Sequence, residues 1–128
     1  MTTRYLICGG RDFDDRALMD KALAALILHP EDARIIHGDA RGADRMAAAW
    51  GKEHAAEVEA FPADWTKYGN AAGPLRNQAM LDVGKPDVVI AFPGGKGTAD
   101  MVQRARKRHV VTIIVTGVGG DWYGEATS

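Results

Sequence analysis

Short apolar runs alternate with longer segments of helical periodicity along most of this 128-residue chain. The runs that predict strands are Tyr5–Cys8, Ala33–Ile36, Glu57–Phe61, Asp87–Phe92 and Val110–Val115. The helical segments between them are Asp15–Leu28, Ala43–His54, Leu75–Val83 and Thr98–Arg108. This alternation predicts a parallel sheet with helices on both faces. We therefore expect a single Rossmann-like, doubly wound α/β fold of about five strands in the order 3-2-1-4-5.

The length of the chain fits one domain with a core of its own. We assign this domain to residues 1–116 and expect residues 117–128 to form a Gly-rich, irregular tail. Between the third strand and the third helix, Pro62 to Gly73 is predicted as a long loop. Pro74 is expected to open that helix, because its missing amide would have no intrahelical partner there.

Charge and cysteine content narrow the possible partners. The chain has 16 Lys and Arg against 17 Asp and Glu, a net charge of -1, so it lacks the basic field that drives nucleic-acid binding. The single cysteine, Cys8, cannot form an internal disulfide and lies in an apolar run, which favours a buried thiol and a cytoplasmic location. No apolar run approaches the roughly 18 residues that cross a bilayer, so we expect no membrane association. The four histidines lack ligand spacing, and we expect neither a metal nor a cofactor.

Three of the predicted strands are followed by glycine-containing turns, which in a parallel sheet meet at one edge. We take as candidate ligand-binding residues Gly9, Gly10, Arg11, Gly38, Asp39, Ala40, Gly42, Asp44, Pro93, Gly94, Gly95, Lys96, Gly97 and Thr98. Arg76 and Asn77 enter a helix at the same edge, and Arg41 adds a further cation. Free amides at a helix start attract anions, because the positive end of the helix dipole lies behind them. These turns therefore predict a phosphate-binding cleft.

Neither standard nucleotide fingerprint is present. In a P-loop, Gly-Lys is followed directly by Ser or Thr, whereas here Gly97 separates Lys96 from Thr98. The first strand ends in Gly-Gly-Arg and lacks the three spaced glycines of dinucleotide-binding folds. A nucleoside monophosphate or a sugar-phosphate derivative fits this pattern better than a triphosphate or NAD.

Three motifs together resemble the YspA-like branch of the SLOG superfamily, which is named for DNA-processing protein A and the Lonely-guy enzymes. They are Gly38-Asp-Ala-Arg-Gly-Ala-Asp44, Gly73-Pro-Leu-Arg-Asn77 with Met80, and Pro93-Gly-Gly-Lys-Gly-Thr98. The resemblance runs from Gly9 to about Val115. It implies a Rossmann-like fold that binds nucleotides or nucleotide-derived ligands, and it implies a homodimer.

Lonely-guy enzymes are phosphoribohydrolases that use an arginine and the glutamate of Pro-Gly-Gly-x-Gly-Thr-x-x-Glu. By this resemblance Arg76 is the candidate catalytic arginine. The glutamate position falls on Met101, which cannot handle a proton, and Asp100 precedes it as the candidate catalytic carboxylate. Asp12, Asp39 or Asp44 from the facing loops are alternatives.

The favoured hypothesis is therefore a nucleotide-derived ligand bound by a sensor or regulator. The first alternative is an enzyme that cleaves the base from a nucleoside monophosphate. The second is a single-stranded DNA-binding module, which the near-neutral charge disfavours. Two roles stay open: Asp44 either binds ribose hydroxyls or caps a helix, and Trp65 and Tyr68 either stack on a base or pack the loop.

Overall fold

The computed structural model describes residues 2–118 and 121–127, and its centre is a six-stranded sheet. The strands are β1 (Thr3–Cys8), β2 (Ala33–His37), β3 (Glu57–Ala60), β4 (Val88–Ala91), β5 (Val111–Val118) and β6 (Asp121–Thr127). Their order is β3-β2-β1-β4-β5-β6, with the first five parallel and β6 antiparallel to β5. The predicted α/β fold and its 3-2-1-4-5 order are confirmed.

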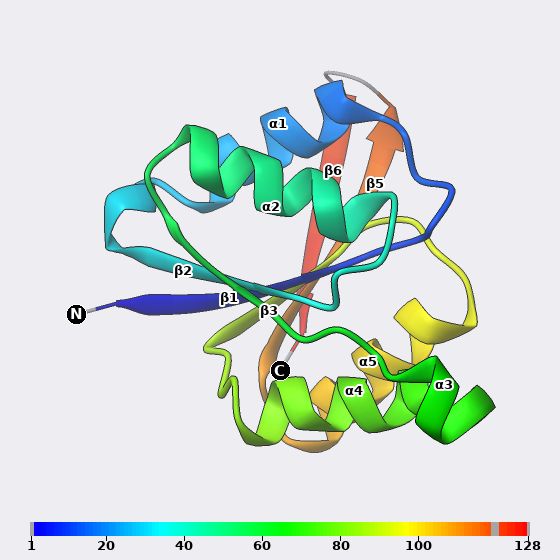
Figure 1. Ribbon diagram of the computed structural model, residues 1–128. Helices are drawn as coiled ribbons and strands as arrows, with labels where there is room; N and C mark the ends of the chain where they lie inside the picture. The colour runs from blue at the N-terminus through cyan, green and yellow to red at the C-terminus, as the bar shows by residue number, and fades with distance from the viewer. Residues whose placement is uncertain (1, 119–120, 128) are drawn as a thin grey trace.

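Helices cover both faces of this sheet. They are α1 (Arg16–Leu26), α2 (Ala43–Glu53), α3 (Trp65–Tyr68), α4 (Ala72–Asp82) and α5 (Lys96–Lys107), with 3-10 turns at Pro30–Asp32 and Gly69–Ala71. Figure 1 shows α1 and α2 above the sheet and α3, α4 and α5 below it. Within the described ranges, no helix has the length and apolar character needed to span a bilayer.

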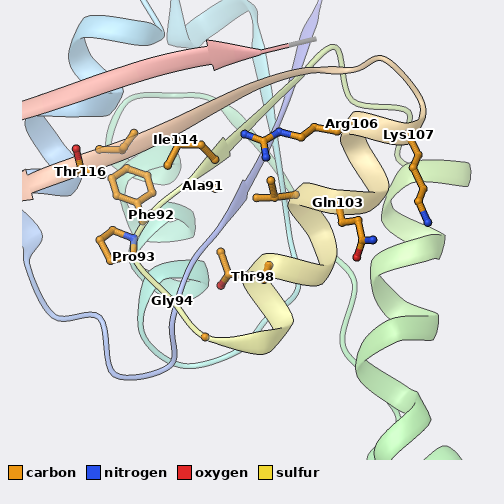
Figure 2. A pocket seen from close by; sticks show the side chains of 14 residues that line it. Ala91, Phe92, Pro93, Gly94, Thr98, Gln103, Arg106, Lys107, Ile114 and Thr116 are labelled. Atoms are coloured by element: carbon orange, nitrogen blue, oxygen red, sulfur yellow. The ribbon is translucent and has the colours of Figure 1, made fainter.

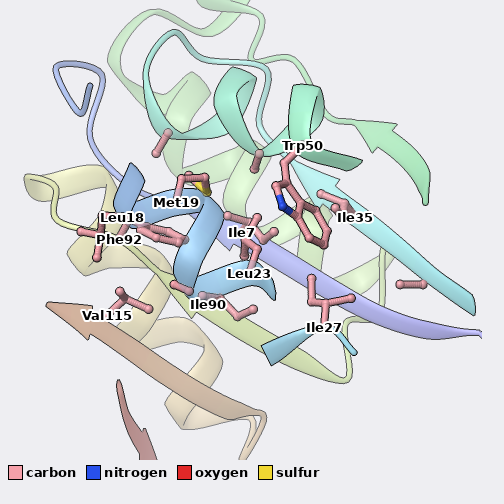
Figure 3. Close-up of a cluster of buried hydrophobic side chains, with 14 residues drawn as sticks. Ile7, Leu18, Met19, Leu23, Ile27, Ile35, Trp50, Ile90, Phe92 and Val115 are labelled. Carbon is pink, nitrogen blue, oxygen red and sulfur yellow. The ribbon is translucent and has the colours of Figure 1, made fainter. Parts of the chain in front are cut away.

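Two apolar clusters fix these layers, one on each face of the sheet. Neighbouring residues of one strand enter opposite clusters because successive side chains of a strand alternate in direction. In β1, Ile7 packs toward α1 and α2, whereas Leu6 belongs to the cluster of α4 and α5. Figure 3 shows the first cluster, in which Trp50 of α2 is almost fully buried. Burial on both faces explains why the strands read as continuous apolar runs.

The prediction of a long loop from Pro62 to Gly73 is wrong, because most of this segment is helical. Helix α3 starts after Asp64, whose side chain accepts a hydrogen bond from the Lys67 amide at 3.0 Å. Helix α4 then begins at Ala72, two residues before Pro74. Pro74 still lies among the first residues of the helix, where the amide that it lacks would have no intrahelical partner.

The prediction of an irregular tail for residues 117–128 is also wrong for the residues that the structure describes, which are 117–118 and 121–127. Strand β5 continues to Val118, and β6 pairs with it from Val118 opposite Asp121 to Thr112 opposite Thr127. The glycine content of this segment argued against a strand. Backbone pairing with the edge of β5 supplies the stabilisation that local propensity does not, because strand propensity depends strongly on context.

Candidate functional site

A cleft of about 980 Å³ lies at the carboxyl ends of the central strands, bordered by α3 and by the first turns of α4 and α5. The candidate residues that line it are Gly9, Gly10, Arg11, Ala40, Asp44, Arg76, Asn77, Pro93, Gly94, Gly95, Lys96, Gly97, Thr98 and Asp100. This is the crevice that the strand order creates beside β1 and β4. The structure thus brings the predicted loops together around one concavity.

The loops after β1, β2 and β4 touch one another directly. The Gly10 amide donates to the Pro93 carbonyl at 2.8 Å, and the Ala43 amide donates to the Gly10 carbonyl at 3.1 Å. A Cβ on Gly10 would lie 3.1 Å from the Cα of Gly94, and one on Gly94 would lie 2.7 Å from the Gly10 amide nitrogen. Glycines at these positions therefore let backbone meet backbone at the base of the cleft.

Three candidates do not line the cleft: Gly38, Asp39 and Gly42. A Cβ on Gly38 would lie 2.7 Å from Cζ of Arg76, so this glycine makes room for a side chain that does line the cleft. Gly42 has a φ of 81°, and a Cβ there would lie 2.6 Å from the Arg11 carbonyl oxygen. Both glycines thus shape the walls of the cleft from behind.

Three exposed charged residues of these loops, Asp12, Asp39 and Arg41, form ion pairs. Asp39 lies 3.7 Å from Arg45, and Arg41, which is not a lining residue either, donates to Asp12 at 3.1 Å. Asp12 lines the rim of the cleft, whereas Asp39 does not. Of the alternative carboxylates, only Asp12 and Asp44 therefore remain within the cleft.

Asp44 is buried at the start of α2 and closes the loop after β2. Its Oδ2 accepts the amides of Gly38 at 3.1 Å and Ala40 at 3.3 Å. Burial raises the pKa of its carboxyl from the ordinary 3.8 to about 6, although the Ala40 hydrogen bond and the charge of Arg76 oppose this shift. Asp44 holds the loop rather than capping its own helix, and it remains a cleft residue.

This raised pKa predicts that stability depends on pH. Between about pH 4 and pH 6 the unfolded chain releases a proton that folded Asp44 keeps, so the free energy of unfolding falls as pH rises. The loss is complete once the pH is well above 6 and amounts to about 3 kcal/mol. Asp44→Asn keeps an acceptor for both amides and removes this loss. Urea unfolding at several pH values checks the difference between the two proteins, and parallel profiles would contradict it.

Arg76 lies half-buried on the floor of the cleft. Its Nη1 donates to the Gly38 carbonyl at 2.5 Å, and its Nε donates to Oδ1 of Asn77 at 3.1 Å. Burial lowers the pKa of Arg76, and the nearby Asp44 carboxylate partly opposes that change. Arginine stays charged in proteins, so the floor of the cleft carries a fixed cation.

Asn77 and Asp100 form a bridge between α4 and α5. Nδ2 of the buried Asn77 donates to the Gly97 carbonyl at 3.2 Å and to Oδ2 of Asp100 at 3.0 Å. The same Asp100 oxygen accepts from Nε of Arg104 at 2.8 Å. Partial burial acts to raise the pKa of Asp100, but the hydrogen bonds from Arg104 and Asn77 outweigh it and lower the pKa. Asp100 is therefore ionised and oriented, which does not suit a general acid.

The turn before α5 offers bare amides to the cleft. Helix α5 begins at Lys96 without a side-chain cap, and the Ala99 amide makes the first intrahelical bond, to the Gly95 carbonyl at 3.0 Å. The amides of Lys96, Gly97 and Thr98 therefore have no partner within the helix. An anion at this end of the cleft would meet these donors together with the positive end of the helix dipole.

An aromatic side chain of α3 lines the same cleft. The Trp65 ring lies 3.3 Å from the position of a Cβ on Gly73, and the guanidinium carbon of Arg11 lies 5.1 Å from the ring centroid. Both side chains line the cleft and are exposed, whereas Tyr68 does not line it. Trp65 thus offers a flat apolar surface in the cleft that also holds the predicted anion site.

Two comparisons place the chain among known proteins. Residues 3–68, about half of the chain, match the family described as YspA, cpYpsA-related SLOG. The chain belongs to this SLOG family. It is also 40% identical over 118 residues to the Gene 61 protein of Mycobacterium phage D29, an alignment that covers 86% of this chain and 94% of the phage protein. The resemblance noted in the sequence is confirmed at the level of the SLOG family.

In this SLOG protein, seven residues that line the cleft were not among the candidate site residues. They are Cys8, Phe13, Asp14, Asn70, Gly73, Pro74 and Met80. Cys8 looks like a core residue because it lies in an apolar run, yet it lines the cleft. Gly73, Pro74 and Met80 belong to the second of the three SLOG-like motifs, and this was their one signal in the sequence. Within residues 2–118 and 121–127, no group of three His, Cys, Asp or Glu side chains is placed to hold a metal ion.

Proposed function

We propose that the chain binds a nucleotide or a nucleotide-derived phosphorylated small molecule in this cleft, as a sensor or regulator. The observation that carries the proposal is the turn from Pro93 to Thr98, whose uncapped amides border the cleft beside Lys96. A phosphate at this turn gains hydrogen bonds and the favourable end of the α5 dipole. Membership of the SLOG family supports a nucleotide-related ligand.

The rest of the cleft suits a ribonucleoside. Trp65 provides a face on which a base can stack, and Arg11 lies over the same ring. Arg76 adds a positive charge to the same cleft. A volume of about 980 Å³ accommodates a nucleoside monophosphate or a somewhat larger derivative.

Calorimetric titration with AMP and with ADP-ribose tests this proposal, with adenosine as the matched control. We expect saturable binding of at least one phosphorylated compound. Adenosine should bind at least tenfold more weakly, because it lacks the group that the α5 amides and Lys96 recognise. The absence of heat with every phosphorylated nucleoside would remove the proposal.

A sensor is favoured over a phosphoribohydrolase because of the two residues at the expected carboxylate position. Met101 is fully buried in the core beneath α5, so this position faces away from the cleft. Asp100 faces the cleft but is fixed by Asn77 and Arg104. Incubation with nucleoside monophosphates, followed by chromatography for free base, separates the two functions. Released base that disappears in Arg76→Ala would establish the enzyme.

Single-stranded DNA binding has less support. The basic end of α5 is partly neutralised, because Arg104 pairs with Asp100 and Arg108 pairs with Asp82. The net charge of -1 gives no long-range attraction to phosphate backbones. A gel shift that weakens with added salt would restore this function.

A further inference from the structure

A second hollow, of about 680 Å³, lies on the other side of α5, between that helix and β5 (Figure 2). Its residues come from the end of β4, from the turn that follows, from one side of α5 and from β5. Among the described residues, the two share four lining residues: Pro93, Gly94, Gly95 and Thr98. The cleft and the hollow therefore border the same turn from two sides.

The floor of this hollow is apolar. It is formed by Ala91 at the end of β4, Val102 of α5 and Ile114 of β5, with Phe92 directly after β4 at its edge. Val102 and Ile114 are only half-buried, so apolar surface is left open between the helix and the strand. A helix, a strand and a turn enclose this surface on three sides. A concave site of this kind fits a small molecule better than the flat face of a partner protein.

The rim of the hollow is polar and positively charged. Gln103, Arg106 and Lys107 border it from α5, and Thr116 borders it from β5. Figure 2 shows Arg106 extending from α5 toward β5. Among the described residues that line the hollow, none is acidic. Glu125 of β6 is paired with Ile114 in the strand register, but it is not one of the lining residues.

We propose that this hollow is a second ligand site, distinct from the cleft, for a small apolar ring that carries one acidic group. The ring would cover the half-buried Val102 and Ile114, and burial of this apolar surface would provide most of the affinity. The acidic group would face Arg106 and Lys107, and an ion pair at this half-open rim would add selectivity for acids over neutral analogues. This proposal does not depend on the identity of the cleft ligand.

Naphthoate, with naphthylmethanol as its neutral analogue, tests the site by calorimetry and by amide NMR shifts on the whole chain. We expect saturable binding of naphthoate, with shift changes concentrated at Ala99, Val102 and Ile114. Naphthylmethanol should bind about tenfold more weakly. A lack of saturable binding, or shifts concentrated at Arg11 and Trp65 in the cleft, would overturn the proposal.

Two variants make the test specific. Ala99 is exposed on α5 and lines only the hollow, so Ala99→Phe fills the site with its own ring and should weaken naphthoate binding at least tenfold. Arg106→Gln should weaken naphthoate and leave naphthylmethanol unchanged. The charge-matched control is Lys21→Gln, an exposed position on α1 across the sheet, which should change neither affinity. Naphthoate binding that persists unchanged in Ala99→Phe would refute the site.

A competing occupant of the same hollow is a second copy of the chain. The molar mass in solution of the unliganded protein and of Ala99→Phe, measured by light scattering, distinguishes a small ligand from a second copy. A dimer that this substitution dissociates would show that the hollow is an interface, and it would overturn the ligand site. Thermal unfolding of each variant confirms that a loss of binding does not reflect a loss of fold.

Discussion

Gly97→Asp is expected to weaken binding of AMP or ADP-ribose by at least hundredfold while leaving the fold intact. Gly97 lines the cleft in the first turn of α5, and a Cβ built there meets no atom within 4 Å. A carboxylate at this position repels a phosphate and competes for the same free amides. The loss corresponds to about 3 kcal/mol of binding free energy. Calorimetry with the ligand identified for the parent protein measures it.

The matched control is Gly97→Asn, which has nearly the same shape without the charge. We expect the asparagine variant to lose no more than about tenfold in affinity. Aspartate in the first turn of a helix interacts favourably with the dipole, so Gly97→Asp should unfold at the same temperature as the parent or higher. Equal affinities for the two variants would show that the phosphate does not bind at this turn.

Gly42→Ala is expected to lower the free energy of unfolding by about 4 kcal/mol, the largest stability effect that we foresee. Two costs combine at this position. Its φ of 81° is one that side chains with a Cβ rarely adopt, and the new Cβ would lie 2.6 Å from the Arg11 carbonyl oxygen. The backbone of the loop after β1 cannot retreat easily, because the Gly10 carbonyl is bonded to the Ala43 amide. Urea unfolding measures the loss.

Gly69→Ala separates these two costs. Gly69 has φ 54° and ψ -134°, close to the 81° and -127° of Gly42, but a Cβ there would meet no atom within 4 Å. Its substitution should cost about 1–2 kcal/mol, from the backbone conformation alone. If the two alanine variants lost equal stability, contact between the loops would contribute nothing measurable.

The sequence predicted the five parallel strands and their order because a sheet buried on both faces needs continuous apolar runs. Those runs are visible without any knowledge of tertiary contacts. The convergence of the loops followed from the same topology, since parallel strands end at one edge. The two errors are the missed helix α3 and the missed strand β6, neither of which has a periodic pattern of its own. Helix α3 has four residues, too few for a periodic pattern, and β6 depends on pairing with β5.

Individual site residues were less predictable than the loops that carry them. The sequence could not tell that Gly38 and Gly42 lie behind the cleft wall, because a glycine looks the same whether it makes room for a ligand or for a side chain. It also left Asp44 open between two roles. Only the geometry shows its carboxylate turned back onto the Gly38 and Ala40 amides. An ion pair that orients a carboxylate in the folded protein, such as that of Asp100 with Arg104, is not marked by any motif in the sequence.

Strand β3 forms one border of the sheet and is only four residues long. It carries Glu57 and Glu59, and Arg34 of β2 lies 2.6 Å from the first of these carboxylates and 3.9 Å from the second. A short border strand with charged side chains is a poor template for further β-pairing. Chain-to-chain growth of a continuous β-structure is thereby discouraged at this border.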